Sequence, residues 1–217
     1  MKKLIIILTT MFGLNLTVSA CSTHDSRIEE SETEQSGESS DSDTDSGVTG
    51  KNLIVYYSFT NNSHVIATEL QKQTGADILR VEPADENVDY NDYSIGLPMM
   101  NLIKAHPDDP ASYPAIKTAA GDLSDYDNVI VVVPLWWNNM AAPLQTFLFK
   151  YGAEMEGKHI GLIVSSGESS IEGVEADVKR LIPNGKHLNP SLWILRSRTN
   201  QCNALIEEWL KTIRWEK

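Results

Sequence analysis

The sequence predicts an α/β domain in which a doubly wound, five-stranded parallel sheet carries helices on both faces. Strand-like and helix-like segments alternate along residues 51–217, and this alternation is typical of parallel strands joined by crossover helices. The segment Val129–Val133 is an unbroken run of β-branched residues. Such a run is typical of a central strand that is buried on both faces.

The first half of the domain begins with a strand, a helix and a second strand. Leu53–Tyr57 is an apolar run, and Asn62–Thr74 carries apolar residues at helical spacing before Gly75. Asp77–Val81 alternates and predicts a short strand. Residues 82–122 fit the pattern least because five prolines interrupt them, so we expect one irregular helix near Leu97–Ala105 and much loop.

The second half continues the alternation after the central strand. Pro143 suits the first turn of a helix that ends near Gly152. The remaining expected elements are a strand at His159–Val164, a helix over 171–181, a weaker strand at Leu188–Leu195 and a terminal helix at Cys202–Ile213.

Residues 1–20 have the composition of an export signal. Lys2 and Lys3 precede an apolar stretch, Leu4–Val18, that is shorter than the about 20 residues a spanning helix needs. The following small residues and Cys21 resemble the lipobox of bacterial lipoproteins. This resemblance implies cleavage before Cys21 and a lipid on its sulfur, hence an exported protein anchored to the cell membrane. The alternative is a plain secretory signal cut after Ala20.

Residues 21–50 differ in composition from the domain that follows. They hold nine of the chain's 30 acidic residues and one of its 18 basic residues, with almost no large apolar side chain. We expect a disordered tether between the membrane and residues 51–217, with an acidic interaction segment as the alternative. The domain keeps 21 acidic and 15 basic residues, so the sequence gives no indication of a nucleic-acid-binding surface.

The number and spacing of the cysteines and histidines bear on whether the chain has a disulfide or a metal site. If Cys21 carries lipid, Cys202 has no partner for a disulfide, and its spacing on the last helix predicts a buried position. The five histidines show no spacing typical of a metal site. We therefore expect neither a disulfide nor a metal site, and no side chain is singled out as catalytic.

The loop after the first strand has the composition of a phosphate-binding loop. It presents hydroxyl and amide side chains, and the following helix directs its free N–H groups toward it. It holds no Lys or Arg, so an anion would be bound by neutral dipoles. The alternative is an ordinary turn in which Asn62 or Ser63 caps the helix. The candidate binding residues are Ser58, Phe59, Thr60, Asn61, Asn62 and Ser63.

Two further loops follow strands that end at the same edge of the predicted sheet. One contains adjacent tryptophans, and exposed indoles in a loop indicate a ligand or a partner, unless both fold back over the core. In the other, Gly167 allows close backbone approach, although the loop could simply cap the next helix. The candidate residues are Pro134, Leu135, Trp136, Trp137, Asn138, Asn139 and Met140 in the first loop and Ser166, Gly167 and Glu168 in the second.

Together these loops resemble those of flavodoxins, in particular bacterial flavodoxin-like proteins with a double-Trp loop. In flavodoxins the first loop reads Ser/Thr-x-Thr-Gly-Asn-Thr and wraps the phosphate of FMN; residues 58–63 read Ser-Phe-Thr-Asn-Asn-Ser. The second resembles Pro-x-Trp-Trp-Gly-x-x-Pro, matched here by Pro134, Trp136 and Trp137. The resemblance covers Lys51 to about Ile213 and implies the strand order 2-1-3-4-5.

Two asparagines replace glycines of these patterns. Asn61 tolerates left-handed backbone better than other non-glycine residues, so the first turn can form with some strain. Asn138 stands where the family has a peptide near the flavin N5, whose flip helps to set the redox behaviour. A β-carbon at that position makes the flip harder.

The resemblance implies FMN binding and electron transfer at the outer face of the membrane. The flavin would be noncovalent, because the segment Asp-x-x-Thr-Gly-Ala-Ser/Thr that marks covalent attachment in exported proteins is absent. The expected partner is a redox protein or a small-molecule electron donor or acceptor. The alternatives are an NAD(P)H-dependent quinone or flavin reductase, with residues 82–122 as a pocket wall, and a surface-binding domain without flavin.

Overall fold

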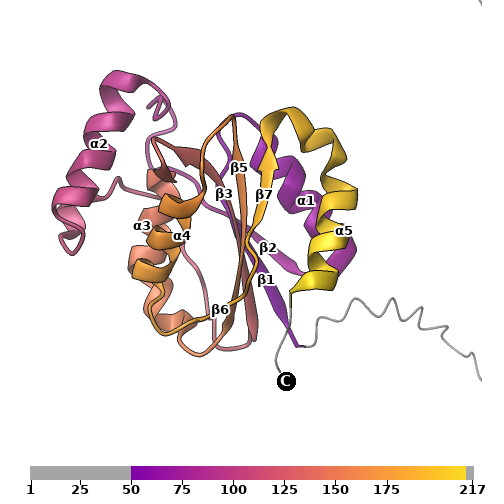
Figure 1. Ribbon diagram of the computed structural model, residues 1–217. Helices are drawn as coiled ribbons and strands as arrows, with labels where there is room; N and C mark the ends of the chain where they lie inside the picture. Colours follow the sequence, from indigo (N-terminus) through magenta and orange to yellow (C-terminus); the bar gives the residue numbers. More distant parts are fainter. Residues whose placement is uncertain (1–49, 214–217) are drawn as a thin grey trace, which may run out of the picture. The chain divides into compact units, whose positions relative to one another are not determined.

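A parallel sheet forms the centre of the domain (Figure 1). The computed structural model describes residues 50–213. The expected signal peptide, the lipidation site Cys21 and the acidic tether up to Thr49 lie outside these residues.

The strand order confirms the predicted doubly wound arrangement. The sheet runs β2-β1-β3-β5, and the short strands β6 and β7 both pair in parallel with β5, β6 near its beginning and β7 near its end. These two strands share the fifth position, so the continuous strand expected at Leu188–Leu195 is wrong. The strands are β1 (Asn52–Tyr56), β2 (Asp77–Arg80), β3 (Asn128–Trp136), β4 (Asn139–Met140), β5 (His159–Ser166), β6 (Lys186–His187) and β7 (Leu192–Leu195).

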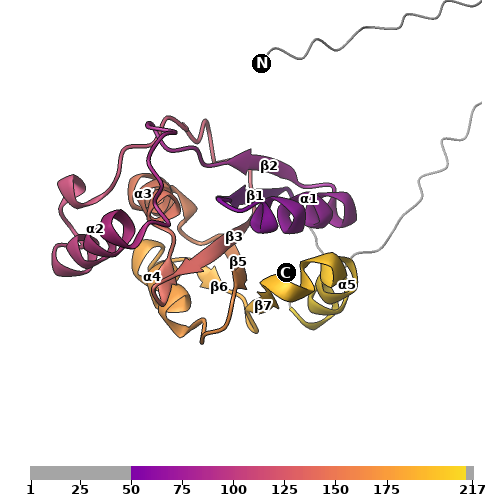
Figure 2. The same cartoon turned by 90° about the horizontal axis from the view of Figure 1, so that it is seen from above.

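Helices cover both faces of the sheet. Seen from above, α1 and α5 lie on one side and α3 and α4 on the other, with α2 beyond them at the periphery (Figure 2). No helix within residues 50–213 is long and apolar enough to cross a membrane. The helices are α1 (Asn62–Thr74), α2 (Tyr93–Ala105), α3 (Ala142–Tyr151), α4 (Glu172–Leu181) and α5 (Cys202–Thr212), with short 3-10 turns η1 (Pro110–Ser112), η2 (Gly152–Met155) and η3 (Arg196–Gln201).

Alternation along the strands divides the core into two layers. In β1, Ile54 and Tyr56 pack on the α1 and α5 side, whereas Val55 packs on the α3 and α4 side. Cys202 is buried and free in the α1 and α5 layer, as its spacing predicted. The β-branched run of β3 is buried on both faces, which confirms the central strand.

The segment expected as a double-Trp loop is instead a β-hairpin. Strand β3 continues to Trp136 and pairs antiparallel with β4, so Trp137 and Asn138 alone make the turn. Both have positive φ, 45° and 64°, and this combination is required at the centre of the type I′ turns that close two-residue hairpins. Asn138 suits this conformation; Trp137 adopts it at a steric cost.

The 82–122 segment contains a longer helix than expected. Helix α2 begins at Tyr93, because the Asp92 side chain accepts a hydrogen bond of 2.7 Å from the backbone N–H of Ser94 and caps the first turn. Pro98 lies inside the helix. The capping aspartate explains why the helix starts four residues before the expected Leu97.

Two adjacent residues of α1 test which face of this helix packs against the sheet. Ile66 is fully buried, and Val65 is 39% exposed. We expect Ile66→Ala to lower the free energy of unfolding by about 2–5 kcal/mol, and Val65→Ala to change it by less than about 0.5 kcal/mol. Urea denaturation measures both, and equal losses would contradict the burial of Ile66 against the sheet.

Candidate functional site

The 58–63 loop joins β1 to α1 at the carboxyl edge of the sheet. Its turn is made by Asn61, whose φ of 69° is left-handed, as its replacement of glycine predicted. The alternative, an ordinary turn in which Asn62 or Ser63 caps the helix, is wrong, because α1 begins at Asn62 and no side chain caps it. The first N–H groups of this helix therefore lack side-chain partners and face the loop region, where an anion would satisfy them.

A cavity opens where the 58–63 loop meets the ends of β3, β5 and β7. It brings together ten of the residues that the sequence singled out, from three loops that are far apart in the chain. Its lining consists of Ser58, Phe59, Thr60, Asn62, Ser63, Asn91, Pro134, Leu135, Trp136, Ser165, Ser166, Gly167 and Arg196.

Two hydroxyls in this cavity lack hydrogen-bond partners. Ser58 and Ser63 are 5% and 1% exposed, and neither side-chain oxygen has a partner among the described residues. Buried hydroxyls are normally satisfied, and leaving one unpaired costs about 1–3 kcal/mol. Both can donate to an anion, so they fit the phosphate of a bound nucleotide.

Aromatic rings border the cavity on the β3 side. The Trp136 ring meets Tyr57 and Phe59 edge to face, with centroids 5.6 and 6.0 Å apart. Trp136 is largely buried, whereas Phe59 is exposed. Burial raises the pKa of Tyr57 far above its usual range, so this phenol stays neutral.

The third loop contributes backbone and one hydroxyl. Ser166 accepts a hydrogen bond of 2.7 Å from the indole N–H of Trp193, so its own proton remains available to donate. Gly167 lies beside Arg196: a Cβ on this glycine would come 3.6 Å from the guanidinium Nη2. The third loop thus offers the cavity the Ser166 hydroxyl as a donor, and a ligand can come close to the backbone at Gly167.

Six predicted residues do not line the cavity: Asn61, Trp137, Asn138, Asn139, Met140 and Glu168. Trp137 instead packs under α2, so closely that a Cβ on Gly96 would lie 2.1 Å from its Cη2 atom. The carbonyl of Asn138 meets α4, where a Cβ on Gly173 would lie 1.7 Å from its oxygen. The turn is therefore held from two sides.

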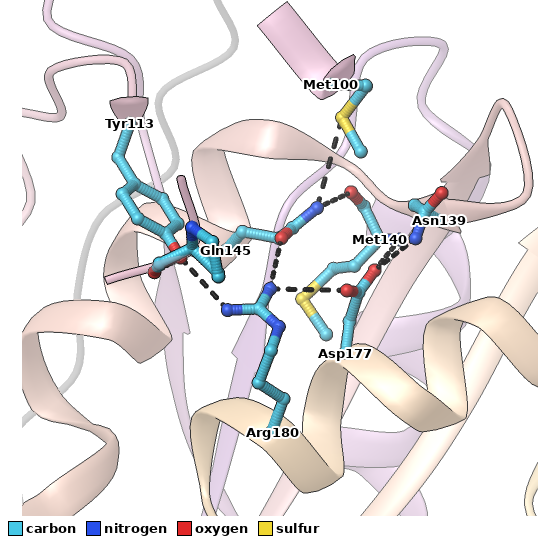
Figure 3. Close-up of polar contacts among 8 residues, drawn as sticks. Met100, Tyr113, Asn139, Met140, Gln145, Asp177 and Arg180 are labelled. Carbon is cyan, nitrogen blue, oxygen red and sulfur yellow. Dashed lines mark hydrogen bonds and ion pairs between the residues drawn. The ribbon is translucent and has the colours of Figure 1, made fainter. Parts of the chain in front are cut away.

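A buried carboxylate fixes strand β4 to α4 (Figure 3). Asp177 accepts hydrogen bonds from the backbone N–H of Met140 at 2.9 Å and from Asn139 Nδ2 at 3.0 Å. Its other oxygen accepts from Arg180 Nη2 at 3.2 Å. These contacts set the position of β4 and, through it, of the preceding turn.

Arg180 extends this polar cluster to α3 and to the segment near η1. It donates to Gln145 Oε1 at 2.9 Å and to the Tyr113 hydroxyl at 3.0 Å, and Gln145 donates back to the Met140 carbonyl at 2.8 Å. Burial alone would lower the pKa of Arg180, but the bonds to Tyr113 and Asp177 outweigh it and raise that pKa. The guanidinium therefore keeps its charge.

Sequence reasoning missed three cavity residues, namely Asn91, Ser165 and Arg196. Ser165 is the first residue of the predicted third loop, and Arg196 directly follows the last strand, so their place at strand ends was a usable signal. Asn91 lies in the 82–122 segment, whose path the pattern did not predict. The 58–63 loop itself holds no Lys or Arg, as the sequence shows, but Arg196 adds a cationic side chain to the cavity.

A larger cavity of about 290 Å³ lies on the other side of Ser58 and Phe59. It is walled by Arg80 at the end of β2 and by residues of the segment that follows. These include Glu82, Pro83, Glu86, Val88 and Tyr90. The beginning of the 82–122 segment therefore walls a cavity beside the 58–63 loop.

Comparison with known proteins identifies the family. A sequence profile of flavodoxins matches residues 51–213, and the chain belongs to the flavodoxin family. This confirms the resemblance drawn from the loops. A search of curated proteins found no match.

Several solved structures share the fold. One, from Bacteroides eggerthii and described as a candidate flavoprotein, is 25% identical, covers 77% of this chain and 100% of its own, and has a TM-score of 0.60. A similarly described protein from Bacteroides uniformis is 22% identical, covers 75% and 99%, and has a TM-score of 0.58. A flavoprotein from Lactobacillus acidophilus, solved in complex with FMN, is 16% identical, covers 70% and 98%, and has a TM-score of 0.56.

The unpaired Ser63 hydroxyl predicts an unusual stability result. Without ligand, we expect Ser63→Ala to leave the free energy of unfolding unchanged or to raise it by up to about 1 kcal/mol. The control Thr146→Val removes a buried hydroxyl that bonds the Pro114 carbonyl at 2.8 Å, and should cost about 1 kcal/mol. Equal losses in urea denaturation would show that Ser63 has a structural partner.

The hydrogen bonds of the Asp177 carboxylate predict that changing this group lowers the stability of the domain. Asp177→Asn replaces one acceptor oxygen by a donor facing other donors, and we expect it to lower the free energy of unfolding by about 2–3 kcal/mol. The control Glu172→Gln removes an exposed carboxylate from the first turn of the same helix and should cost less than about 1 kcal/mol. A difference below about 0.5 kcal/mol in urea denaturation would contradict the role of Asp177.

Proposed function

We propose that this flavodoxin-family domain binds FMN noncovalently and transfers electrons at the outer face of the membrane that anchors it. The observation that carries the proposal is a pair of buried, unpartnered hydroxyls, Ser58 just after β1 and Ser63 in the first turn of α1. Membership of the flavodoxin family supports FMN as the cofactor. Bound FMN would supply the redox chemistry.

Different residues of the cavity would bind the phosphate and the flavin ring of FMN. Ser58, Thr60 and Ser63, with the N–H groups of α1, would hold the phosphate. Trp136 and Phe59 would shield one side of the flavin, and Ser166 with Gly167 would offer polar contacts on the other. A carrier of this kind needs no proton-transfer group from the chain.

Flavin retention tests the proposal directly. Purified protein is incubated with FMN or riboflavin, passed through gel filtration, and its absorbance spectrum recorded. We expect flavin bands to remain with FMN and to be weaker with riboflavin, because only FMN carries the phosphate. A colourless protein that quenches no flavin fluorescence would contradict FMN binding.

The membrane location rests on the lipobox-like sequence before Cys21. We expect the full chain to incorporate labelled fatty acid and to fractionate with membranes, and Cys21→Ser to abolish the labelling. Cys202→Ser serves as the matched control, because Cys202 is buried in the core and should not affect the anchor. Labelling that persists in Cys21→Ser would contradict the lipid anchor.

A reductase is the second candidate function. The 290 Å³ cavity beside Phe59 favours it, since a second substrate could lie next to a flavin bound at the 58–63 loop. In FMN-loaded protein, Val88→Trp should fill this cavity and lower quinone reduction at least tenfold, whereas FMN retention stays unchanged. If the unsubstituted protein does not catalyse the reduction of quinone by NAD(P)H, the reductase function is contradicted and only the carrier function remains.

A further inference from the structure

Arg196 brings a positive charge to a site whose anion-binding loop has none. It is the first residue of η3, directly after β7, and lines the same cavity as Ser58 and Ser63. Its guanidinium lies next to Gly167 of the third loop. Helix η3 is joined to the 58–63 loop by a hydrogen bond of 3.2 Å from the Thr199 hydroxyl to Asn62 Oδ1.

The guanidinium of Arg196 has no partner in the described part of the chain. No ion pair or hydrogen bond involves it, although Arg180 and Arg198 both bond neighbouring side chains. The groups that share its cavity include the unpaired hydroxyls of Ser58 and Ser63. A cation and two free donors around one space are complementary to an anion.

The start of η3 lies at the same end of the sheet as the N-terminus of α1. Ile194, two residues before Arg196, packs in the α1 and α5 layer. The Thr199 hydroxyl joins η3 to Asn62, the first residue of α1. Arg196 accordingly lines the cavity together with Ser58 and Ser63.

We propose that Arg196 is a ligand of the FMN phosphate and sets the preference of this protein for FMN over riboflavin. The inference rests on the proposed FMN binding and adds the charge that the 58–63 loop lacks. A guanidinium matches a phosphate through two parallel N–H donors, and Arg196 lines the same cavity as the 58–63 loop.

Comparing the binding of FMN with that of riboflavin tests whether Arg196 contacts the phosphate, because only FMN carries one. Dissociation constants for FMN and riboflavin are measured by quenching of flavin fluorescence at low and high salt, for the unsubstituted protein, Arg196→Gln and Arg198→Gln. We expect Arg196→Gln to weaken FMN binding about ten- to a hundredfold at low salt and riboflavin binding less than about twofold. Arg198→Gln, on the same short helix, should change neither.

Two other results would contradict the proposal. If Arg196→Gln weakens both flavins equally, or neither, Arg196 does not bind the phosphate. Arg196→Lys keeps the charge but loses the paired N–H donors, so its preference for FMN should fall between those of the unsubstituted protein and Arg196→Gln. A folding defect in the glutamine variant would weaken riboflavin binding as well, and so differs from the expected result. Failure of the proposed function is seen separately, since the unsubstituted protein would then bind neither flavin.

Discussion

The buried carboxylate of Asp177 fixes the β3–β4 hairpin, whose Trp136 borders the cavity, to the rest of the domain. It joins α4 to β4 through two hydrogen bonds, and through Arg180 it reaches α3 and the Tyr113 region. A hairpin whose turn residues both have positive φ needs such outside support, because one of them is a tryptophan. The position of Trp136 at the cavity follows from the same hairpin.

The cavity collects its donors from the carboxyl ends of parallel strands. The domain as a whole is acidic, with 21 acidic and 15 basic residues, yet the groups around the proposed phosphate are hydroxyls, a helix N-terminus and one arginine. Local dipoles and a single guanidinium can hold an anion against a net negative charge, because distant surface charges are screened within about 10 Å at 0.1 M salt. Affinity is thus a property of the site and not of the overall charge.

Local periodicity predicted the buried β3, whereas the resemblance to flavodoxins implied the strand order and the left-handed turn at Asn61. The hairpin was not predicted, since its turn residues Trp137 and Asn138 are not typical of two-residue turns. Asp177 bonds residues of an element far from it in the chain, so no local pattern could assign its partners. The path of residues 82–92 is set in the same way by tertiary contacts.

A crystal structure of the protein with FMN would test the site most directly. We expect the phosphate within hydrogen-bonding distance of the Ser58 and Ser63 hydroxyls, with the Arg196 guanidinium on its far side. Phosphate density elsewhere, with both hydroxyls still unpaired, would contradict the assignment of this cavity as the cofactor site.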